Sequence, residues 1–137
     1  MMLKDNYHVI IVGCGMAGMS AADTLSGHGL DVLIIDENLH TGGQLIRKVA
    51  RKSKLLSPMT PDAMKKKGFA LARRINLLTR GKNAASDKGM ELLIKAQVLG
   101  IFSENRLLIQ MDSQDRGEGL VDVQAEHVIL ATGARER

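Results

Sequence analysis

The stretch Val9–Gly18, VIIVGCGMAG, runs a short β-branched, apolar segment into a G-x-G-x-x-G turn made by Gly13, Gly15 and Gly18. The apolar segment predicts a buried strand. Small and apolar residues follow the turn at helical spacing and predict a helix that packs on a sheet: Ala21, Ala22 and Leu25. A strand, a glycine turn and a helix in this order indicate a pocket for the ADP half of a dinucleotide.

Each glycine of the turn solves a different steric problem. Gly13 is expected to make the tight turn, and Gly15 to leave no Cβ where the backbone approaches a pyrophosphate. Gly18 is expected to let the helix press closely against the strand. The N–H groups at the start of that helix then face the phosphates. The alternative is an ordinary glycine-rich turn without a ligand.

A second apolar run, Val32–Ile35, ends at Asp36. The acid follows the glycine turn at about the 20-residue offset expected of a carboxylate that accepts hydrogen bonds from an adenosine ribose. A carboxylate at this place repels a 2′-phosphate, so NADP is disfavoured relative to NAD or FAD.

Length and composition place limits on the kind of protein. A chain of 137 residues with 45% hydrophobic and 25% charged residues fits one globular domain. It contains no apolar run of membrane-spanning length, and its first residues lead directly into a strand, so neither a membrane span nor a signal segment is predicted. We therefore expect a cytoplasmic protein. The single cysteine, Cys14, excludes an internal disulfide and is interpreted as a packing residue in the turn.

Basic residues are concentrated between Arg47 and Arg80 and give most of the net charge of +4. Aromatic residues make up only 2% of the chain, which leaves little for bases to stack on, so nucleic-acid binding is disfavoured. A solvated basic face, or a surface for an acidic partner or an anionic substrate, is the favoured interpretation. No metal site is predicted, because four residues lack metal-ligand spacing: His8, His28, His40 and His127. No catalytic acid, base or nucleophile can be assigned.

Apolar spacing predicts the remaining helices. A short basic helix is expected around Leu45–Lys52. A second helix is expected from an N-cap at Thr60, with Pro61 in its first turn, to about Arg80, with Gly81 as its stop. Its inward positions are expected to be Met64, Leu71, Ile75 and Leu78.

The pattern changes to strands after Met90. Short strands are expected at 92–95, 97–103, 106–111 and 121–124, with a turn at Glu104-Asn105. The run 128–132 is continuously apolar and predicts a strand buried on both faces, ending at Gly133. The fold class is therefore a three-layer, Rossmann-like α/β domain. Its parallel central sheet is expected from residues 7–12, 31–36, 92–94 and 128–132, with a small antiparallel meander replacing one crossover helix.

The glycine turn, the acid-terminated strand, Gly42-Gly43-Gln44 and the ending ATGARER at 131–137 occur in an order that resembles a known family. It is similar to the N-terminal FAD-binding part of the pyridine nucleotide-disulfide oxidoreductase superfamily, over nearly the whole chain. GGQLIR and ATGARER resemble the branch that contains sarcosine oxidase alpha subunits, opine and proline dehydrogenase subunits and hydrogen cyanide synthase subunits.

The resemblance implies roles for matching residues. It places the pyrophosphate on Gly13, Gly15, Met16, Ala17 and Gly18, and the ribose on Asp36 with Glu37. Gly43 and Gln44 would lie along the dinucleotide toward its reactive half. The backbone of Val98 would contact the adenine, and Gly133 would approach from the other side. The alternatives are a plain turn at Gly42-Gly43 and a merely buried strand residue at Val98.

In that family the Ala-Thr-Gly strand leads into a nicotinamide-nucleotide domain and then a return segment that completes the flavin site. We therefore expect residues 1–137 to be an FAD/NAD(P)-binding domain truncated before both, which needs a completing domain or a partner subunit. The resemblance implies FAD as cofactor and a flavin-dependent, pyridine-nucleotide-linked oxidoreductase that is not active as this chain alone. The alternative is a non-catalytic NAD- or ATP-binding subunit of a multi-subunit amine or amino-acid dehydrogenase.

Overall fold

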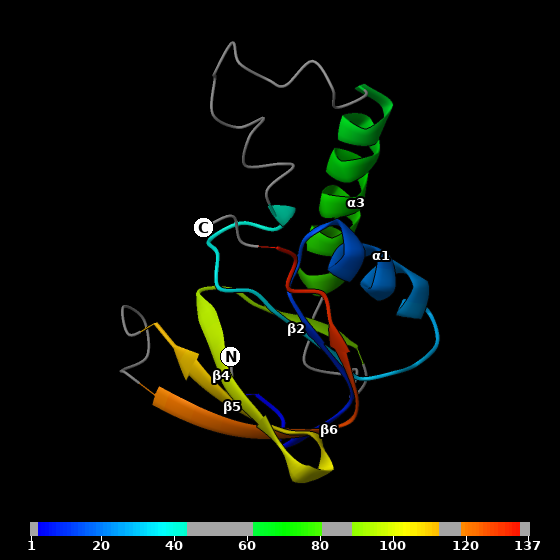
Figure 1. The fold of residues 1–137 in the computed structure, drawn as a ribbon. Coiled ribbons are helices and arrows are strands. Elements are labelled where there is room, and N and C mark those ends of the chain that lie inside the picture. The colour runs from blue at the N-terminus through cyan, green and yellow to red at the C-terminus, as the bar shows by residue number, and fades with distance from the viewer. Residues whose placement is uncertain (1–2, 44–61, 81–88, 113–118, 135–137) are drawn as a thin grey trace.

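In the part of the chain that the structure describes, one six-stranded sheet carries two helices, α1 and α3, on one of its faces (Figure 1). The computed structural model describes residues 3–43, 62–80, 89–112 and 119–134. The elements are β1 (Asn6–Val12), α1 (Met16–Leu25), β2 (Val32–Ile35), α3 (Asp62–Arg80), β3 (Met90–Leu93), β4 (Ala96–Phe102), the 3-10 turn η1 (Ser103–Asn105), β5 (Arg106–Met111) and β6 (Gly119–Leu130).

The strand order β3-β2-β1-β6-β5-β4 joins a parallel half to an antiparallel half. β1 pairs in parallel with β2 and with the second half of β6, and β2 pairs in parallel with β3. The strands β4, β5 and the first half of β6 form an antiparallel meander. The predicted α/β fold with a parallel sheet and a small meander is thus confirmed.

The strand β6 corrects two predictions. Residues 121–124 and 128–132 are not separate strands, because β6 runs without a break from Gly119 to Leu130. Its first half pairs with β5, and the chain then continues straight into the pairing with β1. Leu130 is not buried on both faces but 65% exposed. The neighbouring strand β5 pairs with β6 only up to Gln124, so β5 does not cover the end of β6 at Leu130.

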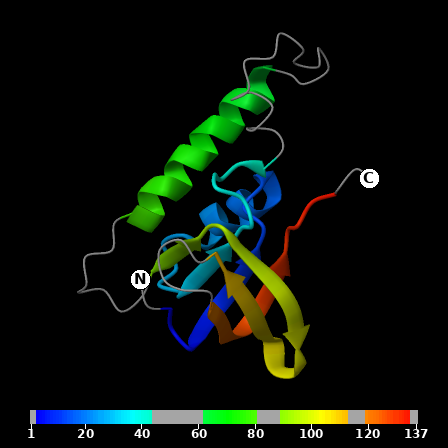
Figure 2. The ribbon, with the colours of Figure 1, turned by 90° about the vertical axis from the view of Figure 1, so that its left-hand side faces the viewer.

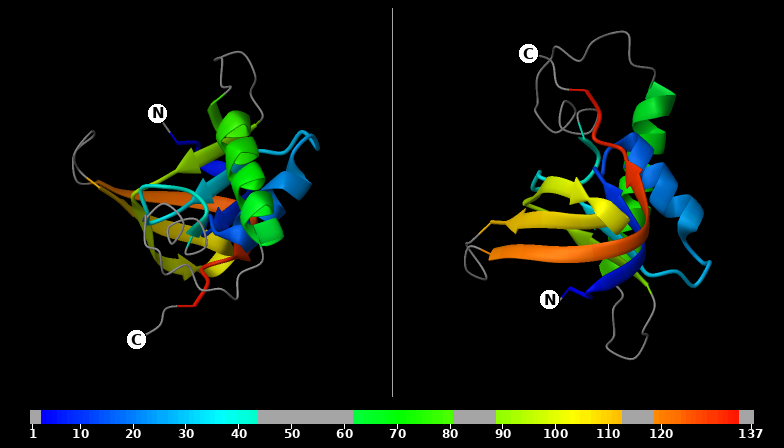
Figure 3. Two further views of the ribbon diagram at one scale, coloured as in Figure 1. Left: turned by 90° about the horizontal axis from the view of Figure 1, so that it is seen from above. Right: turned by 60° about the horizontal axis from the view of Figure 1, so that its bottom comes forward.

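Two hydrophobic cores lie on opposite faces of the parallel strands. α1 and α3 cover one face, and the meander curves over the other (Figure 3). The helix-side core is centred on Ile11, Met19 and Ile34, all fully buried. The meander-side core is centred on Ile10 and Leu33 and closes over the alternate side chains of the same strands. Alternation along β1 and β2 thus produces the three layers.

The helix α3 confirms the predicted range but not every inward residue. Ile75 is fully buried and Ala72 nearly so, whereas Leu78 is 37% exposed. The helix packs on the sheet and lies alongside α1 (Figure 2), and an Arg74–Asp23 ion pair joins the two helices. Among the residues of α3 whose burial is described, Gly68, Ala72 and Ile75 are buried, and Leu78 lies beside this buried stripe. The expected caps Thr60, Pro61 and Gly81 and the helix around 45–52 lie outside the described residues.

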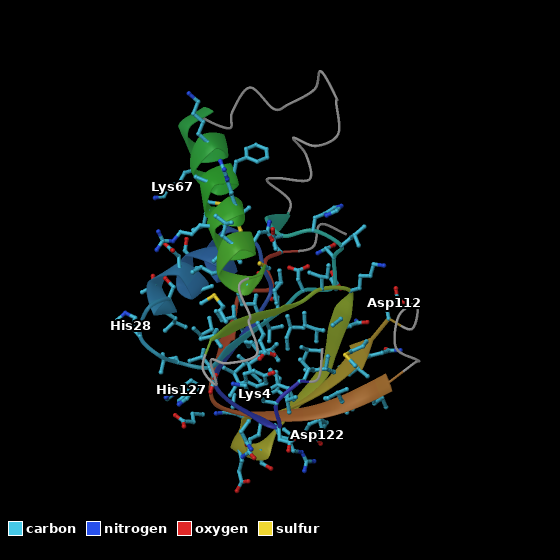
Figure 4. The ribbon with its side chains drawn as sticks, turned by 180° about the vertical axis from the view of Figure 1, so that it is seen from behind. Lys4, His28, Lys67, Asp112, Asp122 and His127 are labelled. Atoms are coloured by element: carbon cyan, nitrogen blue, oxygen red, sulfur yellow. The ribbon has the colours of Figure 1, made fainter. Side chains whose placement is uncertain are left out.

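A cluster of polar side chains connects β1 and β3 near the residues at which these two strands begin. The hydroxyl of Tyr7 donates a hydrogen bond to buried Glu91 at 2.9 Å and accepts one from the N–H of Lys4. Burial and the neighbouring Glu91 raise the pKa of Tyr7. The ammonium of Lys4 lies 2.6 Å from Asp31, and although burial raises the pKa of Asp31, hydrogen bonds from Lys4 and Gly89 lower it overall. Lys67 lies on α3, away from Lys4 and this cluster (Figure 4).

Candidate dinucleotide-binding groove

Two adjoining cavities lie where β1, β2 and β6 end. The larger, of about 780 Å³, borders the start of α1 and the end of β6, and includes Gly15, Met16, Ala17, Gly42, Gly43, Leu130 and Gly133. The smaller, of about 200 Å³, reaches toward β4 at Ala96, Gln97 and Val98. Both are lined by Gly13, Asp36, Glu37, Asn38 and Thr132, so they form one groove. A groove at the carboxyl ends of parallel strands is where open α/β sheets bind ligands.

The glycines of the first turn are required by its geometry. Gly13 has φ +103°, and a Cβ there would lie 2.3 Å from the carbonyl oxygen of Ala131. A Cβ on Gly18 would lie 1.9 Å from the carbonyl oxygen of Gly13. The predicted tight turn and close helix packing are therefore present. At Gly15 the nearest atom to an added Cβ is the Cα of Gly43 at 4.0 Å, so this position opens on the groove.

The N-terminus of α1 faces the larger cavity. Gly15 is the N-cap of the helix, and no side chain caps it. Met16 and Ala17 form its first turn and line the cavity. A helix start that no acidic side chain occupies presents backbone N–H groups and the positive end of the helix dipole, which favour a phosphate.

Asp36 holds the glycine turn in place. Its side chain is buried, with Oδ2 accepting a hydrogen bond from the N–H of Cys14 at 2.6 Å. Oδ1 accepts two more from Asn38, at 2.8 Å from the backbone N–H and 2.7 Å from Nδ2. The carbonyl of Cys14 in turn accepts a hydrogen bond from the N–H of Gly42 at 2.7 Å. The loop after β2 is therefore hydrogen-bonded to both the N–H and the carbonyl oxygen of Cys14.

The structure brings most of the predicted site residues to this groove. Glu37 lines both cavities, Val98 lines the smaller one, and Gly133 lines the larger one. Gly43 lies so close to Gly15 that a Cβ on it would be 3.0 Å from the Cα of Gly15. Gly18 lies under the turn against Gly13, and Gln44 falls outside the described residues.

Three lining residues with polar side chains were not predicted: Asn38, Gln97 and Thr132. Asn38 carried a signal, because an asparagine shortly after a strand commonly forms a local hydrogen-bonded turn. Thr132 carried a signal too, because it lies next to Gly133 in the ATGARER segment. Gln97 carried none, since only the approach of β4 to the end of β1 places it here.

Cys14 is a packing residue, as its position in the turn indicated. Its side chain is fully buried, and burial, with the nearby Asp36 carboxylate, raises the pKa of the thiol to about 12. Only the thiolate is nucleophilic, so this cysteine is inert in the folded protein.

We expect iodoacetamide at pH 8 to modify Cys14 at least about 100-fold more slowly in the folded protein than in urea, because both burial and the raised pKa suppress the thiolate. Mass spectrometry of quenched samples measures the two rates. Comparable rates in the native and unfolded protein would contradict this placement of Cys14.

In the four described ranges, no three histidine, cysteine, aspartate or glutamate side chains gather as metal ligands would. His28 and His127 lie on different segments (Figure 4). Among the helices that the structure describes, none is long and apolar enough to cross a bilayer.

Comparison with known proteins identifies the family. The sequence profile of the pyridine nucleotide-disulphide oxidoreductases matches residues 7–137. The chain belongs to this family. Relatives within the predicted branch include an opine oxidase subunit from Rhizobium meliloti, 31% identical over 98% of the chain and 24% of the relative. Hydrogen cyanide synthase subunit HcnB of Pseudomonas aeruginosa is 30% identical over 96% of the chain and 25% of the relative.

Solved structures of other oxidoreductases share the fold. The L-proline dehydrogenase of P. horikoshii aligns with a TM-score of 0.57 at 24% identity, over 93% of this chain and 22% of that one. Thioredoxin reductase of T. acidophilum aligns with a TM-score of 0.54 at 20% identity, over 98% of this chain and 38% of that one. The chain spans about a quarter of the length of the two curated relatives named above. The chain therefore carries the Rossmann-like dinucleotide-binding fold of a pyridine nucleotide-disulphide oxidoreductase domain.

Proposed function

We propose that this chain binds FAD and supplies the ADP-holding part of a flavin-dependent oxidoreductase. The observation that carries the proposal is the groove itself, in which the start of α1 and the Asp36 carboxylate line one cavity. A pyrophosphate would lie on the amides of Gly15, Met16 and Ala17, with the ribose toward Asp36 and Glu37. The adenine would enter the smaller cavity beside Val98.

The residues of this chain orient the cofactor. When bound, the flavin supplies hydride transfer, while the protein provides position and electrostatics. The turn fixed by Asp36 keeps the phosphate-binding amides in place before a ligand arrives, which lowers the cost of ordering them on binding. A completing domain or partner subunit would enclose the flavin half beyond Gly43 and Gly133, and exchange of hydride with a nicotinamide nucleotide or an amine belongs to that assembly.

A second candidate function is a non-catalytic subunit that binds NAD or ATP within an amine or amino-acid dehydrogenase. The observation that favours it is that the described groove offers groups for phosphates, ribose and adenine, which FAD, NAD and ATP share. It supports binding of an adenine nucleotide more directly than it supports any chemistry.

Purified protein distinguishes the two functions. FAD binding should give a yellow protein whose flavin spectrum survives gel filtration, with Kd measured by quenching of flavin fluorescence. A colourless protein whose melting temperature rises with NAD or ATP but not with FAD would support the second function. Absence of binding by FAD, NAD, ATP and ADP would overturn both.

The two acids at the ribose position should discriminate against a 2′-phosphate. We expect NADP to bind at least about 10-fold more weakly than NAD, because its additional 2′-phosphate would face Asp36 and Glu37. Competition against a fluorescent ADP analogue at constant ionic strength measures both affinities. Equal affinities would place the ribose elsewhere than at these carboxylates.

A further inference from the structure

Asn38 donates two hydrogen bonds to one oxygen of the Asp36 carboxylate, which faces the ribose in the proposed binding mode. Its backbone N–H and its side-chain Nδ2 both donate to Oδ1 of Asp36, at 2.8 and 2.7 Å. The other oxygen, Oδ2, accepts the Cys14 N–H at 2.6 Å. Asn38 also lines both cavities, at the point where they join.

Most of the hydrogen-bond acceptor sites on the Asp36 carboxylate are therefore occupied. A carboxylate has about four lone-pair sites on its two oxygens, and three of them already have donors. The two donors on Oδ1 leave the remaining site on Oδ2, next to the Cys14 bond. They also stop rotation of the carboxylate about its last side-chain torsion, which is otherwise broad.

We infer that Asn38 is a positioning residue that sets recognition of the ribose, an inference that rests on the proposed function. Its amide fixes the Asp36 carboxylate so that a single acceptor site, on Oδ2, meets a ribose hydroxyl. The ligand class is thus a nucleotide with an intact ribose diol, and Asn38 acts through Asp36 without forming the phosphate site.

The ribose contribution can be isolated by comparing ADP with 2′,3′-dideoxy-ADP, which lacks both hydroxyls. In the unchanged protein we expect the dideoxy nucleotide to bind at least about 10-fold more weakly, since it loses a hydrogen bond to a charged acceptor. In Asn38→Ala this ratio should fall at least about threefold, because Oδ1 of Asp36 loses the Nδ2 hydrogen bond and the carboxylate is held only by the backbone N–H groups of residues 38 and 14. Loss of fold alone would weaken both nucleotides equally and leave the ratio unchanged.

Asn105→Ala is the matched control, since Nδ2 of Asn105 donates a hydrogen bond to the carbonyl of Glu126, and Asn105 does not line the groove. It should keep the ratio of the unchanged protein. If N38A does not fold, the pair N38T and N38V tests the same point, because the two differ by a hydroxyl donor in place of a methyl. N38T should retain the ratio and N38V should lose it.

A ratio unchanged in N38A, or lost equally in N38T and N38V, would overturn the role of Asn38 while leaving the nucleotide site standing. Failure of the unchanged protein to bind ADP would instead overturn the proposed function. The two failures are thus distinguishable in one set of titrations by isothermal calorimetry.

Discussion

Replacing Gly18 with alanine is expected to destabilise the fold by at least about 3 kcal/mol, because the new Cβ would lie 1.9 Å from the carbonyl oxygen of Gly13. The oxygen belongs to the backbone and the backbone of residue 18 fixes the position of the Cβ, so neither atom can turn away by a change of side-chain rotamer. α1 would have to lift from β1, which would expose the fully buried side chain of Met19. For a domain of this size, the melting temperature should fall by about 10 °C, measured by circular dichroism.

The matched control is Gly15→Ala, which adds the same methyl group three residues earlier. There the nearest atom to the Cβ is 4.0 Å away, an ordinary contact, so its stability cost should be no more than the roughly 1 kcal/mol lost at an N-cap. Equal melting temperatures for the two variants would mean that α1 does not pack on the turn as described.

The strand, glycine turn and helix at the start of the chain were predictable because their requirements are local. Gly13 needs a positive φ, and Gly18 needs the absence of a Cβ against a carbonyl only five residues away in sequence. The hairpin at β4 and β5 was predictable for the same reason, and β5 has the predicted bounds Arg106–Met111.

The strand β6 was not predictable in this way. Its sequence reads as two short strands because polar Glu126 and His127 interrupt the apolar pattern. In the structure both side chains are exposed, while the backbone continues from pairing with β5 to pairing with β1. The prediction that Leu130 is buried was wrong because this residue borders the groove. That placement depends on how the strands end relative to one another.

Asp36 lies at the groove, as its position after the second strand indicated, but its hydrogen bonds could not be read from the sequence. The distance along the chain from Asp36 back to the glycine turn predicts a ribose contact, yet the carboxylate also accepts the N–H of Cys14, 22 residues away. Only the parallel pairing of β1 and β2 brings these two groups together. The role inferred for Asn38 depends on the same pairing, so the sequence alone did not identify Asn38 as a site residue.

Gly15→Ala should weaken ADP binding by at least about 100-fold while changing the stability of the fold little. An added Cβ at residue 15 meets only the Cα of Gly43 and otherwise projects into the larger cavity, where the pyrophosphate would approach the backbone. The methyl would hold the phosphates away from the N–H groups of Met16 and Ala17, and charge-assisted hydrogen bonds weaken steeply with distance. Calorimetric titration of the variant with ADP, next to its thermal melt, measures both quantities.

Gly133→Ala is the matched control for the loss of ADP affinity in Gly15→Ala. Gly133 lines the same cavity, and an added Cβ there meets nothing within 4 Å, although its φ of +69° strains any side chain. If the phosphates lie on the start of α1, G133A should lose far less ADP affinity than G15A. Equal losses would show that the cavity as a whole excludes the nucleotide when narrowed, and would remove the N-terminus of α1 as the phosphate site.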